Sequence, residues 1–137
     1  METLRVEYGL DTDGMTAPQK RAACRSALDV IAEDAAKFEC DIPWSMASEW
    51  PPEVLEAAKV LRRVSRKKQK DPSYGVTGIL KVGDEAVWGA FLTFAPWAFD
   101  AGVWSADHVQ VASLSDSSDS IGLRLTDSQR RAVEDSV

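Results

Sequence analysis

The sequence predicts an α+β domain: a mostly antiparallel sheet of about five strands, two early helices packed on one face and a short C-terminal helix. Two observations predict this class. The first half of the chain contains two long segments in which apolar residues recur every three or four positions, which is the period of a helix. The second half contains short apolar or alternating segments separated by turn residues, which is typical of strands joined by hairpins.

The composition is that of one globular domain. The chain has 137 residues, of which 45% are hydrophobic and 28% charged, and no linker-like segment divides it, so we expect a single domain over residues 1–137. Its first residues include acids, unlike those of a signal peptide, and its longest uncharged stretch, residues 86–99, is too short to span a bilayer as a helix. We therefore expect a cytoplasmic protein without a membrane partner.

The first half predicts one strand and two helices. Residues 4–10 alternate between apolar and polar side chains, which indicates a half-buried strand, and residues 11–14 form a turn. Thr16 is a good N-cap for a helix over residues 17–39, and a second helix is expected over residues 52–68. The apolar face of the first helix would consist of Cys24, Leu28, Ile31, Ala35 and Phe38. Three members of this face are expected to be buried against the sheet: Leu28, Ile31 and Phe38.

The second half predicts four strands and a helix. The expected strands cover residues 74–82, 86–94, 108–114 and 120–125. A turn at residues 83–85 would join the first two, and the loop over residues 115–119 the last two. Residues 86–94 are apolar on both faces, which favours a central strand. Thr126 and Gln129 match a capping box, so we expect the terminal helix to begin there.

The chain is rich in tryptophan, with five among its 137 residues. Two lie in the predicted connection between the helices and two in the predicted loop after the central strand, while Trp88 falls within that strand. Prolines accompany both loops, and an indole on a stiff loop is a favoured anchor of protein interfaces. We expect the four loop tryptophans to cluster at one end of the domain and to bind a partner protein: Trp44, Trp50, Trp97 and Trp104.

Positive charge is concentrated in one segment. Residues 59–81 carry eight Lys or Arg against one acid, whereas residues 1–58 carry five against 12 and residues 82–137 three against nine. In and just after the predicted second helix, four cations recur on one face: Lys59, Arg63, Arg66 and Lys70. Such a stripe can follow the phosphates of a nucleic acid. It can equally be a solvated face whose charges complement the helix dipole.

An acidic turn follows the first predicted strand. It contains Asp11 and Asp13, two positions apart, and resembles the first motif of the haloacid-dehalogenase-like phosphohydrolases over about ten residues. The resemblance implies that Asp11 is the nucleophile and Asp13 the general acid in chemistry on a magnesium-bound phosphate. The late lysine of that family has no counterpart here, because no lysine follows Lys81, and Met15 stands where the family usually has threonine.

The other reactive side chains form no complete catalytic set. Cys24 and Cys40 would be about 24 Å apart along a helix, too far for a disulfide, so we expect free thiols. His108, the single histidine, lies in one short segment with Ser105 and Asp107, whereas a catalytic triad converges from different elements. Apart from the two aspartates of the acidic turn, the sequence therefore predicts no catalytic residues, no metal site and no cofactor.

These observations favour a small intracellular protein-binding module, of the inhibitor or immunity-protein type, that acts by occupying the surface of its partner. Two alternatives stay open. One is a nucleic-acid-contacting protein that uses the basic helix over residues 59–70. The other is a metal-dependent phosphohydrolase at Asp11 and Asp13.

Overall fold

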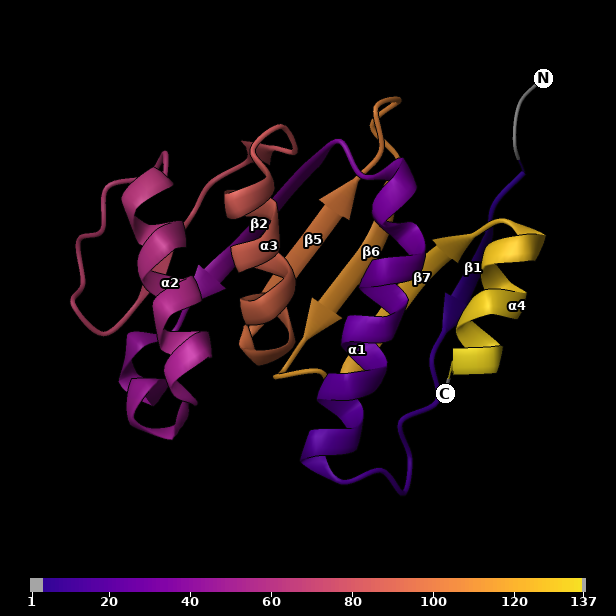
Figure 1. Cartoon of the computed structure of the whole chain (residues 1–137), viewed down its shortest axis with the longest axis horizontal. Coiled ribbons are helices and arrows are strands. Elements are labelled where there is room, and N and C mark those ends of the chain that lie inside the picture. The colour runs from indigo at the N-terminus through magenta and orange to yellow at the C-terminus, as the bar shows by residue number, and fades with distance from the viewer. Residues whose placement is uncertain (1–3, 137) are drawn as a thin grey trace.

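The computed structural model describes residues 4–136 and has two layers, a sheet and a set of helices that cover one of its faces (Figure 1). The described strands are β1 (Val6–Gly9), β2 (Lys37–Ile42), β3 (Gly75–Val76), β4 (Leu80–Lys81), β5 (Asp100–Trp104), β6 (Gln110–Ser115) and β7 (Ser120–Leu125). The α-helices are α1 (Ala17–Ile31), α2 (Pro52–Val64), α3 (Glu85–Phe94) and α4 (Asp127–Ser136). Short 3-10 segments are η1 (Ala32–Asp34), η2 (Trp44–Glu49) and η3 (Ala95–Trp97).

The sheet is antiparallel throughout its described pairings. Its strand order is β1-β7-β6-β5-β2-β3, with β4 also paired to β2, so the α+β class with a mostly antiparallel sheet is confirmed. The sheet has seven strands instead of about five. One reason is that residues 74–82 form two short strands. Between them Gly78 has φ of +68°, a left-handed conformation that interrupts a strand and favours glycine.

The core lies between the sheet and the helices, and Phe38 is at its centre. The Phe38 ring is fully buried, with its centroid 4.5 Å from that of Phe91 and 5.4 Å from that of Trp88, both on α3. Leu28 and Ile31 on α1 are also fully buried, as the sequence predicts. The described part of the chain, residues 4–136, contains no helix long and apolar enough to cross a membrane.

Phe38 reaches the core from a strand, so the predicted helix over residues 17–39 is wrong at its end. Helix α1 stops at Ile31, and β2 begins at Lys37. Side chains in β2 alternate between the two faces of the sheet, which places Phe38, Cys40 and Ile42 in the core. Ala35 and Phe38 continue the helical spacing of α1 by coincidence, and no glycine or proline marks its end.

The predicted central strand over residues 86–94 is also wrong, because this segment is helix α3. The expected turn at residues 83–85 is the start of that helix, where the Asp84 carboxylate accepts hydrogen bonds from the N–H groups of Ala86 and Val87. Helix α3 lies between α1 and α2 and over the sheet (Figure 1). A helix covered on several sides is apolar nearly all round, which a periodicity argument cannot distinguish from a buried strand.

The last part of the chain follows the predictions closely. Strand β7 covers residues 120–125, and the hairpin loop before it contains three successive non-glycine residues with positive φ, Asp116, Ser117 and Ser118. The capping box at α4 is formed, because the Thr126 N–H donates to the Gln129 side chain and the Gln129 N–H donates to the Thr126 hydroxyl.

Both cysteines are free, as predicted, and both are buried. Burial raises the pKa of the Cys24 thiol to about 11 and also raises that of Cys40. Neither side chain is therefore a reactive thiolate at neutral pH.

Truncation of the central ring tests this description of the core. Phe38→Ala should lower the free energy of unfolding by about 3–5 kcal/mol, because it opens a cavity that the surrounding rings cannot fill. Phe99→Ala is the matched control, since the Phe99 side chain is 38% exposed, and it should cost less. Urea denaturation measures both variants, and equal losses would contradict the central position of Phe38.

Candidate functional site

The structure does not bring the four loop tryptophans together on one surface. Trp44 lies in η2 and contacts Trp50, with their ring centroids 5.7 Å apart. Trp50 packs edge-on against Phe94 at 5.0 Å and is only 8% exposed. Trp50 is therefore part of the core, while the half-buried Trp44 lies at its margin.

The other two tryptophans lie on different parts of the domain. Trp97 is in η3, just before β5, where the Arg21 guanidinium of α1 lies 3.8 Å from its ring centroid. Trp104 is the last residue of β5, not a loop residue as predicted. Its ring covers Gly102 on the sheet face opposite the helices, since a Cβ atom at Gly102 would lie 2.7 Å from the indole.

The predicted basic stripe is also rearranged, because helix α2 ends at Val64, four residues before the predicted end. The backbone of Ser65 is extended there, and its hydroxyl donates to the Leu61 carbonyl, which satisfies one of the helix's last acceptors. The Arg66 N–H then donates to the Thr77 carbonyl at 2.8 Å. Lys59 and Arg63 thus belong to the helix, whereas Arg66 and Lys70 follow it in the segment over residues 65–74.

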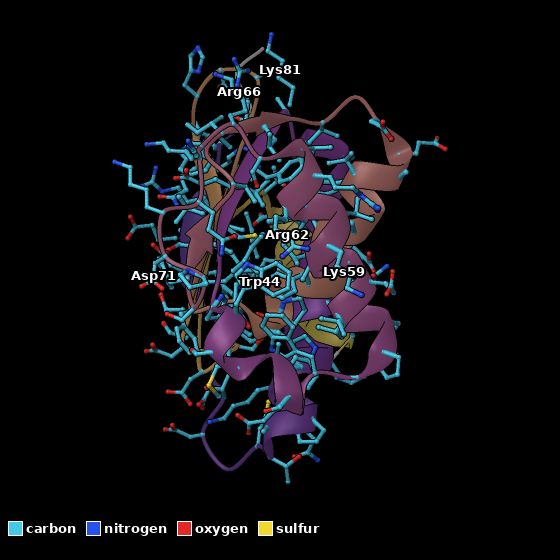
Figure 2. All side chains as sticks on the ribbon, turned by 90° about the vertical axis from the view of Figure 1, so that its left-hand side faces the viewer. Trp44, Lys59, Arg62, Arg66, Asp71 and Lys81 are labelled. Atoms are coloured by element: carbon cyan, nitrogen blue, oxygen red, sulfur yellow. The ribbon has the colours of Figure 1, made fainter. Side chains whose placement is uncertain are left out.

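Cations from α2, from this segment and from β4 nevertheless gather at one end of the molecule. Figure 2 faces that end and labels four of them. We call this surface the basic edge and define it by Lys59, Arg62, Arg63, Arg66, Lys67, Lys68, Lys70 and Lys81. Of these, Lys59 is half-buried and the rest are exposed.

The charge of the basic edge is almost uncompensated. Lys59 pairs with Glu56 at 3.2 Å on the same helix, and no other cation of the edge makes an ion pair within residues 4–136. Asp71 is the single acid among residues 59–81. The Asp71 carboxylate accepts hydrogen bonds from the backbone N–H and the hydroxyl of Ser73, and these bonds lower its pKa. This carboxylate is therefore engaged by a neighbouring residue and, in the described part of the chain, pairs with no cation of the edge.

An aromatic ring holds one of these cations in place. The Arg62 guanidinium lies 4.5 Å from the Trp44 ring centroid, a cation–π contact that Figure 2 shows from the side of the edge. Within the described residues, the Arg62 side chain donates no hydrogen bond to a protein acceptor. The buried Trp44 Nε1 also lacks a partner there. A stacked guanidinium keeps its in-plane N–H groups free for an external acceptor.

A hollow of about 220 Å³ lies beside this stack, between the end of α2 and β3. Three members of the basic edge line it, Arg62, Lys67 and Lys68, and no acidic residue does. Sequence reasoning missed the hollow and the contact between Arg62 and Trp44, because both depend on how the chain turns after α2. The signal that the sequence did contain was the high density of Lys and Arg over residues 59–81.

The sheet face opposite the helices is polar and carries a buried carboxyl group. Asp41 is 4% exposed; its carboxyl accepts hydrogen bonds from the Tyr74 hydroxyl at 2.8 Å and from the N–H groups of Phe99 and Asp100 at 2.9 and 3.1 Å. Burial raises the pKa of Asp41 despite these donors. Asp41 thus joins β2 to the start of β5 and to the residue before β3, which is a structural role.

The acidic turn of the phosphohydrolase resemblance is a turn and a helix cap. The Asp13 N–H donates to the Asp11 carboxylate at 3.0 Å, and both side chains are exposed. Thr16 caps α1 through a complete capping box with Gln19. Among residues 4–136, no group of three or more His, Cys, Asp or Glu side chains is arranged to hold a metal ion.

The segment around His108 closes the hairpin between β5 and β6. The Ser105 hydroxyl donates to Asp107, and the Val109 N–H donates to the Ser105 oxygen. The His108 Nδ1 atom lies 2.8 Å from the Lys37 ammonium instead of facing Ser105, so these residues do not form a triad.

No protein-family model, curated protein or solved structure matches this chain. The basic edge with Trp44 is the feature of the described surface that most directly indicates a function.

The buried carboxyl group gives the fold a defined pH dependence. Because the pKa of Asp41 is raised above its usual value of 3.8, the folded state holds this proton more tightly than the unfolded state. As pH rises from 3.8 through the raised pKa, this group should lower the free energy of unfolding. Chemical denaturation of the native chain and of Asp41→Asn across this range isolates the effect. The prediction would be contradicted if the free energy of unfolding of the native chain, relative to that of Asp41→Asn, stayed constant or increased as the pH rises.

Proposed function

We propose that this protein is a binding module that occupies the acidic surface of another protein through the basic edge and Trp44. The proposal rests on one observation. The cations of the basic edge, which apart from Lys59 make no ion pair within residues 4–136, lie beside the Trp44 indole, which packs on Trp50. The inhibitor or immunity-protein type of action predicted from the sequence requires such a contact surface and no catalytic group.

Charge segregation supports an acidic partner. The chain as a whole has a net charge of −6, yet residues 59–81 carry eight cations against one acid. Like charges held close together repel, and an anionic partner would relieve that repulsion. Complementary charge also accelerates association and selects against partners of the wrong sign.

The Trp44–Arg62 pair supports an interface rather than a purely solvated surface. Trp and Arg are the residues that most often dominate the binding energy of protein interfaces. Trp44 rests on the buried Trp50, so its ring is presented at little cost in conformational entropy. Of the four predicted contact tryptophans, Trp44 is the one that stacks on a cation of the basic edge, and we therefore retain it as the central contact.

A nucleic acid is the second candidate, because cations without ion pairs also suit a phosphate backbone. We prefer a protein partner because the ring that stacks on a cation of the edge, Trp44, is half-buried, whereas proteins that bind single strands stack successive bases on several rings. Helix α2 also ends at Val64, so the cations do not form the regular helical row on which the nucleic-acid hypothesis depended.

Charge reversal at the edge tests the proposal. The double variant Arg63→Glu, Arg66→Glu should lose the partner that the native chain captures from its host after nuclease treatment. Arg130→Glu, Arg131→Glu on α4 changes the net charge equally and should keep it. Binding should also weaken when salt rises from 0.1 to 1 M, which shortens the Debye length from about 10 to about 3 Å. A partner retained equally by both double variants would refute the basic edge as the interface.

Two tryptophan variants separate binding from folding. Trp44→Ala should reduce affinity for the captured partner by about 2 kcal/mol, roughly thirtyfold, with a smaller loss of stability. Trp50→Ala should instead lower the free energy of unfolding by about 3–5 kcal/mol. Because Trp44 rests on the Trp50 ring, this variant should also weaken binding, but by less than Trp44→Ala does. Calorimetric titration and thermal unfolding measure the two effects. Trp44→Ala with native affinity would remove Trp44 from the interface.

A further inference from the structure

The hollow beside Trp44 has the features of a site for one compact anion. Arg62, Lys67 and Lys68 line it, and its remaining lining residues are uncharged. The buried Ile42 side chain and the backbone of β3 form part of its wall. An apolar wall excludes water, and electrostatic attraction is stronger where water is excluded.

The polar groups of the hollow divide into those already occupied and those free to bind. The Ser65 hydroxyl donates to the Leu61 carbonyl, and the Gln69 amide donates to the Asp71 carbonyl. The three cations, by contrast, make no ion pair within residues 4–136, and Arg62 is held by the Trp44 ring. The cations are therefore the groups left to bind a ligand, and one of them has a fixed orientation.

Size and charge select the chemistry of the ligand. At about 220 Å³ the hollow is smaller than the roughly 300–1,000 Å³ of pockets that take drug-sized ligands, so it suits a single chemical group. The three positive charges of the hollow exceed the single negative charge of one carboxylate. A planar guanidinium also matches two oxygens of a phosphoryl group, and lysines complement the group as point charges.

We propose that this hollow binds a phosphate monoester in its dianionic form. The inference deepens the proposed function and rests on the same surface, since the phosphoryl group would sit next to Trp44 at the protein contact. A phosphorylated side chain of the partner and a small phosphorylated compound share this chemistry. A nucleic-acid strand carries singly charged diesters along its length and needs a row of cations, which the end of α2 at Val64 interrupts.

The test is a titration followed by amide NMR, with inorganic phosphate and a short phosphoserine peptide as probes. Sodium chloride keeps the ionic strength constant, and the unphosphorylated peptide is the blank. We expect saturable shifts for the amides of residues 65–69 and 75–76. Arg62→Gln should weaken binding at least tenfold, whereas Arg63→Gln, the adjacent cation outside the hollow, should change it less than twofold.

A second variant guards against a change in folding, because Arg62 also contacts Trp44. Lys68 also lines the hollow, whereas the cation that stacks on Trp44 is Arg62. Lys68→Gln should therefore weaken phosphate binding several-fold with an unchanged melting temperature. Tighter binding of the phosphopeptide than of inorganic phosphate would identify a phosphorylated side chain as the source, and equal binding a small compound. Either result supports the site.

Three results would overturn the inference. These are shifts that do not saturate, equal losses in the Arg62→Gln and Arg63→Gln variants, or a decathymidine oligonucleotide that binds more tightly than both phosphate probes. The titration needs no partner protein, so it separates this inference from the proposed function. A partner lost on reversal of Arg63 and Arg66, together with no phosphate binding, would leave the protein interface standing and remove the phosphate site.

Discussion

Most apolar side chains of the sheet face one side, and the rest of the structure depends on that constraint. Residues alternate along each strand, so Phe38, Val103 and Leu114 point into one layer while their neighbours point to the other face. All four α-helices of residues 4–136 must then pack on a single face to bury this surface (Figure 1). Helix α3 takes the position over Phe38, where three aromatic rings fill the centre of the core.

The place of the basic edge follows from this crowding. With α1 and α3 over the middle strands, α2 is left at the margin, where it buries Val54, Ala58 and Leu61 and keeps its other flank in solvent. That flank and the segment after it contain seven of the chain's 16 Lys and Arg residues. The early end of α2 turns this segment back along β3, so residues that a longer helix would have spread over several turns instead surround one hollow.

The sequence predicted the elements whose signals are local. Strand β7 and the capping box at Thr126 and Gln129 were predictable because turn and cap residues determine them through neighbouring hydrogen bonds. The burial of Phe38 was also predictable, although its strand was not, since one side chain can satisfy helical and strand spacing together. Helix α3 was missed because its apolar character comes from neighbours far apart in sequence.

The candidate surface was predictable in its charge and not in its shape. The excess of Lys and Arg over residues 59–81 is visible in the sequence, and so is the abundance of tryptophan. Which indole meets which cation depends on where α2 ends and how the chain returns to the sheet. No local sequence pattern predicts how the chain returns to the sheet, so the pairing of Arg62 with Trp44 emerged from the tertiary structure alone.

The shortness of β3 and β4 has a consequence for how copies of this protein meet. An exposed sheet edge invites another chain to add a strand, and natural proteins discourage this with short edge strands and lysines. Here the outer edge of β2 is covered by two strands of two residues each, and between them Thr77 bonds to both backbone groups of Cys40. Two copies brought together at this edge would find few free backbone groups and facing positive charges, so the cations that attract a partner also oppose fibrillar stacking of the protein on itself.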